Sequence, residues 1–205
     1  MTRPDQATSG GGWTRTEILK AAVGGGVAVA GATVIGVRSG SSASASQPSS
    51  ATDAQILNFF LLLERVQQGF YRQALAASRL NGELRDFAQT VAGQERAHVA
   101  FLARRLGARA QPGPKSNFGP AFKSDASFRR TAIDLEEATI AAYIGQGANL
   151  TTPTMAAIAP LVSVEARQVA WIRDIAGENP APRAADPART ASDVLGELRS
   201  KGYIE

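Results

Sequence analysis

The sequence predicts an all-α fold: an antiparallel four-helix bundle with one long crossover between the second and third helices and a short C-terminal helix. Apolar residues recur at spacings of three and four through four long stretches, the period of a helix with one buried face. Only 6% of the 205 residues are aromatic, while alanine is abundant, which favours close-packed helices. The connections between the stretches are short, long and short, as in a bundle whose second connection crosses one end.

Residues 1–45 have the pattern of an export signal. Charged residues up to Lys20 precede an uncharged run rich in glycine and alanine, Ala21 to Val37. A small-x-small cleavage pattern follows at residues 43–45. We therefore expect residues 1–45 to direct export and residues 46–52 to form a linker.

The signal resembles a twin-arginine signal with an altered motif, and an uncleaved N-terminal membrane anchor is the alternative. Thr14 to Lys20 is similar to a twin-arginine signal, with Thr16 in place of the second arginine. An uncleaved anchor would have an apolar run at the short edge of what spans a bilayer. Both interpretations place the following domain in the periplasm, cell envelope or extracellular space, either free or membrane-anchored through this segment alone.

Composition excludes several kinds of site. The chain has no cysteine, which excludes thiolate metal sites, disulfides and cysteine nucleophiles, and leaves histidine and carboxylates as the strong metal ligands. Its net charge is +4. Without residues 1–45, which hold four basic and two acidic side chains, 18 basic and 16 acidic ones remain. This near balance predicts no affinity for nucleic acid.

The bundle is expected over residues 53–178. Its first helix is predicted for residues 53–78, with Thr52 or Asp53 as the N-cap. The buried stripe of this helix is expected to contain Leu57, Leu61, Glu64, Gln68, Tyr71 and Leu75.

The second and third helices flank the long connection. A turn at residues 81–82 leads to a second helix over 83–106, which ends at Gly107. Residues 111–124 contain three prolines and two glycines and form the crossover. The third helix is predicted for residues 126–147.

The fourth helix and the tail complete the chain. Thr152 is expected to cap a helix over residues 153–176, which has a proline at its first position. Residues 179–205 form a tail, in which a Pro/Ala-rich linker over 179–187 precedes a short amphipathic helix over 191–200. We expect that helix to pack on the outside of the bundle.

Each long helix places one glutamate near its middle on the stripe that it buries. These residues are Glu64, Glu95, Glu136 and Glu165. His98, the only histidine, lies three residues after Glu95 and therefore on the same helix face. Four-helix bundles build di-metal centres from one glutamate on each of two helices and Glu-x-x-His on the other two. The pattern thus predicts a buried metal site.

The chain resembles the ferritin-like superfamily, and most closely the exported ferritin-like domain family that includes the plant desiccation-related proteins. The resemblance covers the four helices and extends to the residues around the glutamates: Leu63-Glu64 with Phe70-Tyr71, Gln94-Glu95 to Leu102, Leu135-Glu136 with Ala142-Tyr143, and Val164-Glu165-Ala166-Arg167. It implies one or two divalent ions, iron or manganese. It also implies iron oxidase or peroxide-consuming activity, because Fe(II) in such sites reacts with dioxygen or peroxide.

The resemblance implies roles for individual residues. Glu64, Glu95, His98 and Glu136 are the implied ligands, and Glu165 is a bridging or terminal one. Tyr71 and Tyr143 would lie behind them, where they either exchange an oxidising equivalent or simply fill the core.

The sequence departs from the family pattern at Gln168, where the fourth helix should carry histidine. An amide oxygen is a weaker ligand than imidazole, and Gln168 is at best a substitute ligand. We therefore expect an incomplete or asymmetric site. One position keeps the full set of Glu64, Glu95 and His98, and a second depends on Glu136 and Glu165.

A metal-free structural or stress-protective (desiccation-protective) bundle is the alternative function. Four carboxylates in a bundle core repel one another, and burial also favours their neutral forms. Without metal, one or more of them must be protonated and hydrogen-bonded, for instance to Gln168, Tyr71 or Tyr143. Both the metal-binding and the metal-free function are compatible with a homo-oligomer, but nothing in the sequence specifies an iron-storage cage.

Overall fold

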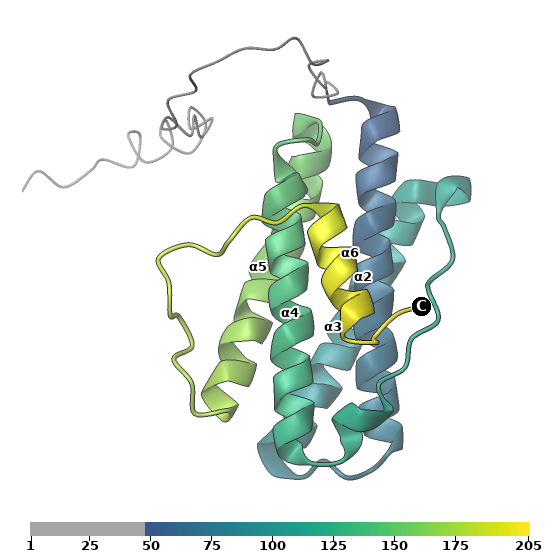
Figure 1. Cartoon of the computed structure of the whole chain (residues 1–205). Helices are drawn as coiled ribbons and strands as arrows, with labels where there is room; N and C mark the ends of the chain where they lie inside the picture. Colours follow the sequence, from purple (N-terminus) through teal and green to yellow (C-terminus); the bar gives the residue numbers. More distant parts are fainter. Residues whose placement is uncertain (1–47) are drawn as a thin grey trace, which may run out of the picture. The chain divides into compact units, whose positions relative to one another are not determined.

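The computed structural model describes residues 48–205, and the predicted export signal or anchor lies outside them. The described residues form four long helices, α2 (Ser50–Ala76), α3 (Gly82–Leu106), α4 (Asp125–Gly147) and α5 (Thr152–Ile175), and a short α6 (Ala191–Ser200). Figure 1 shows the long helices side by side. None of the described helices is long and apolar enough to cross a membrane.

The predicted all-α bundle is confirmed. Helices α2 and α3 pack as one hairpin and α4 and α5 as another, and contacts of α2 with α4 and of α3 with α5 join the two. The long connection contains two short 3₁₀ helices, η1 (Gly107–Arg109) and η2 (Gly119–Phe122). No strand forms within residues 48–205.

The predicted N-cap of the first long helix was wrong. The cap is Ser49, whose hydroxyl oxygen accepts a hydrogen bond of 3.2 Å from the Thr52 backbone N–H. The prediction failed because several small polar residues precede this helix, and each of them is an acceptable cap.

Asp53 instead stabilises the start of α5. Its carboxylate accepts hydrogen bonds from the Thr151 N–H (2.9 Å), the Thr151 hydroxyl (2.6 Å) and the Thr154 hydroxyl (2.6 Å). Burial opposes its ionisation, but these bonds outweigh burial and lower the pKa of Asp53. The N-cap of α5 is thus Thr151 rather than the predicted Thr152, and the capping carboxylate comes from another helix.

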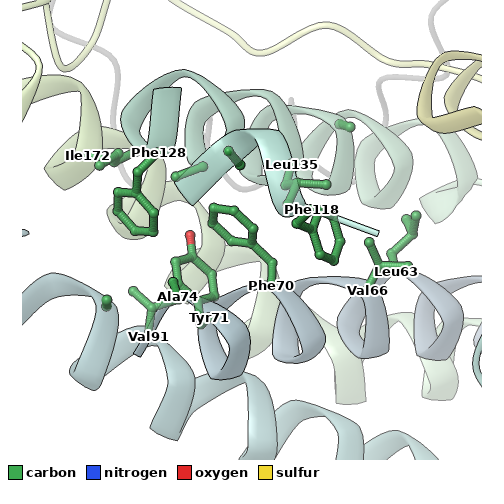
Figure 2. Packing of buried hydrophobic residues seen from close by; sticks show 14 of the residues in the cluster. Leu63, Val66, Phe70, Tyr71, Ala74, Val91, Phe118, Phe128, Leu135 and Ile172 are labelled. Carbon is green, nitrogen blue, oxygen red and sulfur yellow. The ribbon is translucent and has the colours of Figure 1, made fainter. Parts of the chain in front are cut away.

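An aromatic cluster fills the part of the core around Phe70. Figure 2 shows the ring of Phe70 between those of Phe118 and Phe128, at centroid distances of 5.2 Å from each. Phe118 comes from the crossover, so the long connection contributes to the core as well as joining helices. Tyr71 packs edge-on against Phe70 and Phe87. This packing fixes the position of the Tyr71 hydroxyl.

The C-terminal tail contacts both the bundle and the crossover. Helix α6 packs on α4 and buries Val194 and Leu198. The last residues then run beside the crossover (Figure 1), where Asn117 N–H donates to the Tyr203 carbonyl (3.2 Å) and Glu205 N–H to that of Lys115 (3.3 Å).

The segment before α6 lies directly on the backbone of α4. The Arg189 N–H donates to the Ala141 carbonyl at 3.0 Å. A Cβ atom at Gly145 would lie 1.9 Å from the Arg189 carbonyl oxygen, which is far inside van der Waals contact. The absence of a side chain at Gly145 is therefore required for this approach.

We predict that Gly145→Ala destabilises the docked tail, because one backbone must move away from the other. Overpacking of this kind costs about 1–3 kcal/mol, a fall in Tm of several degrees for a chain of this size. Thermal unfolding and limited proteolysis of residues 179–190 measure the effect. Gly147→Ala is the matched control, since nothing lies within 4 Å of its Cβ position. Equal Tm values for the two variants would contradict the prediction.

Candidate metal centre

The four glutamates predicted to face inward are buried at the middle of the bundle. Each comes from a different long helix, and the exposed fraction of each is 0%. His98 is 7% exposed. The helical period explains this placement, because each glutamate interrupts the apolar stripe that its helix must bury.

Three of the glutamates surround the imidazole of His98. The Nδ1 atom of His98 lies 3.0 Å from Glu165 Oε1, 3.1 Å from Glu64 Oε2 and 3.8 Å from Glu95 Oε2. One ligand atom from each of these four residues falls within 4.8 Å of all the others. The structure thus brings Glu165 into the group that the sequence assigned to Glu64, Glu95 and His98.

Two carboxylate oxygens in this group have no hydrogen-bond donor in the described part of the chain. They are Glu95 Oε2 and Glu165 Oε1. Glu165 Oε1 is close to His98 Nδ1, but the single N–H on that atom cannot serve three carboxylates at once. Buried carboxylate oxygens without donors are costly to ionise, and a cation between them removes that cost.

Glu136 lies beside this group and not within it. Its Oε1 accepts a hydrogen bond from the Tyr71 hydroxyl, and its Oε2 accepts one of 2.7 Å from Gln67 Nε2. Gln67 Nε2 also lies 3.4 Å from Glu165 Oε2, and the Thr139 hydroxyl donates to Gln67 Oε1 at 3.0 Å. The predicted role of Glu136 as a ligand stays a prediction.

Gln67 was missed by the sequence interpretation, which placed Gln68 on the buried stripe. The structure buries Gln67 (1% exposed) and leaves Gln68 partly exposed. A repeated spacing could have identified it, since each helix carries a polar residue three positions after its glutamate. These pairs are Glu64/Gln67, Glu95/His98, Glu136/Thr139 and Glu165/Gln168.

The remaining polar residues singled out by sequence are hydrogen-bonded to the glutamates. The Tyr143 hydroxyl donates to Glu64 Oε1 at 2.5 Å. Gln168 Nε2 donates to Glu95 Oε1 and to Gln94 Oε1, both at 2.9 Å. Gln168 therefore presents its amide N–H₂, and not its oxygen, to the buried carboxylates.

The pKa values reflect burial and mutual repulsion. Burial, followed by the charge of Glu64, raises the pKa of Glu165 to about 7. Burial and the neighbouring Glu165 raise the pKa of Glu95 and of Glu136 well above the usual range. For His98, burial lowers the pKa, but the carboxylates of Glu165, Glu64 and Glu95, which face its Nδ1–H, outweigh burial and raise the value to about 12.

We predict that the metal-free protein loses stability as pH rises. The folded-state pKa of Glu165, about 7, lies above its unfolded value of 4.5. The folded state therefore holds this proton more tightly, and the stability that the proton contributes is lost as pH rises from 4.5 to about 7. The raised pKa of His98 acts in the same direction from pH 6.5 upward. Each proton retained only by the folded state changes the free energy of unfolding by about 1.4 kcal/mol per pH unit.

Thermal unfolding of chelator-treated protein between about pH 5 and pH 8 measures this dependence. Glu165→Gln keeps the shape of the side chain without its titration, and its Tm should change less with pH. A Tm of the unsubstituted protein that rises between these pH values would contradict the prediction.

Comparison with known proteins agrees with this architecture. Residues 52–178, more than half of the chain, match the ferritin-like domain family. A search of curated proteins finds no match. The matched segment includes nearly all of α2 and the whole of α3, α4 and α5. It also includes the four buried glutamates, His98 and the residues that hydrogen-bond to them. The chain belongs to the ferritin-like domain family.

Proposed function

We propose that this protein binds a divalent metal ion, iron or manganese, at Glu64, Glu95, His98 and Glu165. The observation that carries the proposal is the pair of buried oxygens without donors, Glu95 Oε2 and Glu165 Oε1, within reach of His98 Nδ1. The residues fit such an ion, because carboxylate oxygens and an imidazole nitrogen are suitable ligands for iron and manganese.

The charge of the site supports the same conclusion. Four glutamates and one histidine are buried together, and neither lysine nor arginine hydrogen-bonds these glutamates among residues 48–205. A divalent ion would compensate two of the negative charges. His98 must lose its Nδ1 proton to act as a ligand through that atom, so we expect metal binding to release a proton.

The surrounding residues orient the carboxylates. The Tyr143 hydroxyl donates to Glu64 Oε1, and Gln168 Nε2 donates to Glu95 Oε1. Glu95 Oε2 then has no donor, and Glu64 Oε2 has only the His98 proton that metal binding would release. A bound iron ion would supply redox chemistry with dioxygen or peroxide, and we propose iron oxidation or peroxide consumption as the activity. The Tyr143 and Tyr71 hydroxyls remain protonated, since burial raises the pKa of both.

Metal content tests the proposal. The purified protein is stripped with a chelator, reloaded anaerobically with Fe(II) or Mn(II), desalted and analysed for metal. We expect at least one ion per chain. His98→Ala should weaken binding by about tenfold or more, since even residues that only support metal ligands have effects of that size.

Arg96→Ala is the matched control, because Arg96 is an exposed residue on the same helix. Its metal content should equal that of the unsubstituted protein. Loading should also raise Tm in proportion to the logarithm of metal concentration, since the ion binds the folded state. No retained metal and no change in Tm would rule the proposal out.

A metal-free structural or stress-protective bundle is the second candidate. It is favoured by the number of donors that the protein itself supplies to the glutamates, from Tyr71, Tyr143, Gln67, Gln168 and His98. On this view His98→Ala costs about 1 kcal/mol for a lost hydrogen bond and changes no metal content. The metal analysis above separates the two functions.

We also propose that the domain acts outside the cytoplasm, on the basis of the N-terminal pattern alone. Mass spectrometry of the protein recovered from the producing cell tests this. A mature N-terminus at Ser46 is the expected result, and intact residues 1–45 in the membrane fraction would support the anchor instead. Intact chains in the cytoplasm alone would contradict export.

A further inference from the structure

We infer that the site holds one metal ion and not two, because the amide of Gln67 occupies the place that a second ion needs. The inference rests on the proposed function, since it concerns the number of ions at that site. It follows from the directions in which the buried hydrogen-bond donors point.

The carboxylate oxygens that lack hydrogen-bond donors lie in one place, although the buried amide oxygen Gln168 Oε1 also has no partner among residues 48–205. Glu95 Oε2 and Glu165 Oε1 are the carboxylate oxygens without donors, and both belong to the group around His98 Nδ1. A second ion would have to use Glu136, the one buried glutamate outside that group. Both oxygens of Glu136 are already hydrogen-bonded, to Tyr71 and to Gln67.

Gln67 is hydrogen-bonded both to Glu136 and to the group. Its Nε2 lies 2.7 Å from Glu136 Oε2 and 3.4 Å from Glu165 Oε2, so its N–H₂ group bridges the two carboxylates. An amide N–H₂ has no lone pair for a metal, and its hydrogens carry positive charge. A donor thus already contacts both of the carboxylates that a second cation would have to share.

The orientation of this amide follows from its neighbours. The Thr139 hydroxyl donates to Gln67 Oε1 at 3.0 Å. Inverting the amide would place its oxygen against Glu136 and Glu165, whose oxygens repel it once these carboxylates ionise to bind a cation. The side chain is 1% exposed, so solvent cannot relieve that repulsion.

Gln168 acts in the same way on the other side. Its Nε2 donates to Glu95 Oε1 at 2.9 Å, at the position where a histidine ligand was expected. The two glutamines therefore direct N–H donors at the outer oxygens of Glu165 and Glu95. Of the oxygens of Glu95 and Glu165, only the inner ones, close to His98, remain without a donor, and the unpartnered Gln168 Oε1 is a neutral amide oxygen and a weaker ligand than a carboxylate.

Manganese stoichiometry and electron paramagnetic resonance test the inference. The protein is stripped, loaded with Mn(II), desalted and measured for metal per chain and for magnetic coupling between ions. We expect one Mn(II) per chain with the spectrum of an isolated ion. Gln67→Glu removes the donor and adds a ligand of the same shape, and should raise the content to two coupled ions.

Gln68→Glu is the matched control, because it adds the same charge to the next residue, which lies outside the cluster. It should keep one isolated ion. Two ions in the unsubstituted protein, or one ion in folded Gln67→Glu, would overturn the inference while leaving metal binding intact. No ion in any of the proteins would overturn the proposed function and the inference with it.

A second variant covers the case in which Gln67→Glu fails to fold. Glu136→Gln removes the charge that a second ion would require and keeps the shape of the side chain. We expect it to retain one isolated Mn(II), whereas Glu95→Gln should lose it. Loss of manganese from Glu136→Gln would show that Glu136 is a ligand and would overturn the inference.

Discussion

The burial of four carboxylates around one imidazole is the constraint on which this structure depends. Removing a charged group from water is costly unless a partner compensates it. His98 supplies at most one positive charge to four glutamates, and tyrosine and glutamine donors supply hydrogen bonds but no charge. The bundle must therefore keep protons on its glutamates or accept a cation from solution. Either solution makes the centre of the fold sensitive to pH and to ions.

The hydrogen-bond donors divide this cluster into two unequal halves. Around His98 the carboxylates lie close together and two oxygens lack donors. Around Glu136 every oxygen has a donor, and Thr139 in turn fixes the orientation of Gln67. The asymmetry thus arises from uncharged residues as well as from the exchange of a histidine for Gln168. Residues that are not metal ligands themselves thus determine how many carboxylate oxygens remain available to bind a metal.

Local signals predicted the helices and the inward glutamates, because both follow from the helical period. That period could not distinguish Gln67 from Gln68, since adjacent positions at the edge of a wide apolar stripe differ in burial only through the packing of neighbouring helices. The capping of α5 by Asp53 also had no signal, because the partners are far apart in sequence. Contacts between distant segments leave no pattern in either segment alone.

The pairing of the last residues with the crossover has a consequence for the order of assembly. The two helical hairpins join neighbouring parts of the chain, whereas Asn117 bonds to Tyr203 across most of the domain. Closing so long a loop is slow compared with hairpin formation. The hydrogen bonds that join the crossover to residues 203–205 can form only after those residues have been synthesised. We therefore expect a nascent chain to form the two hairpins before the crossover pairs with residues 203–205.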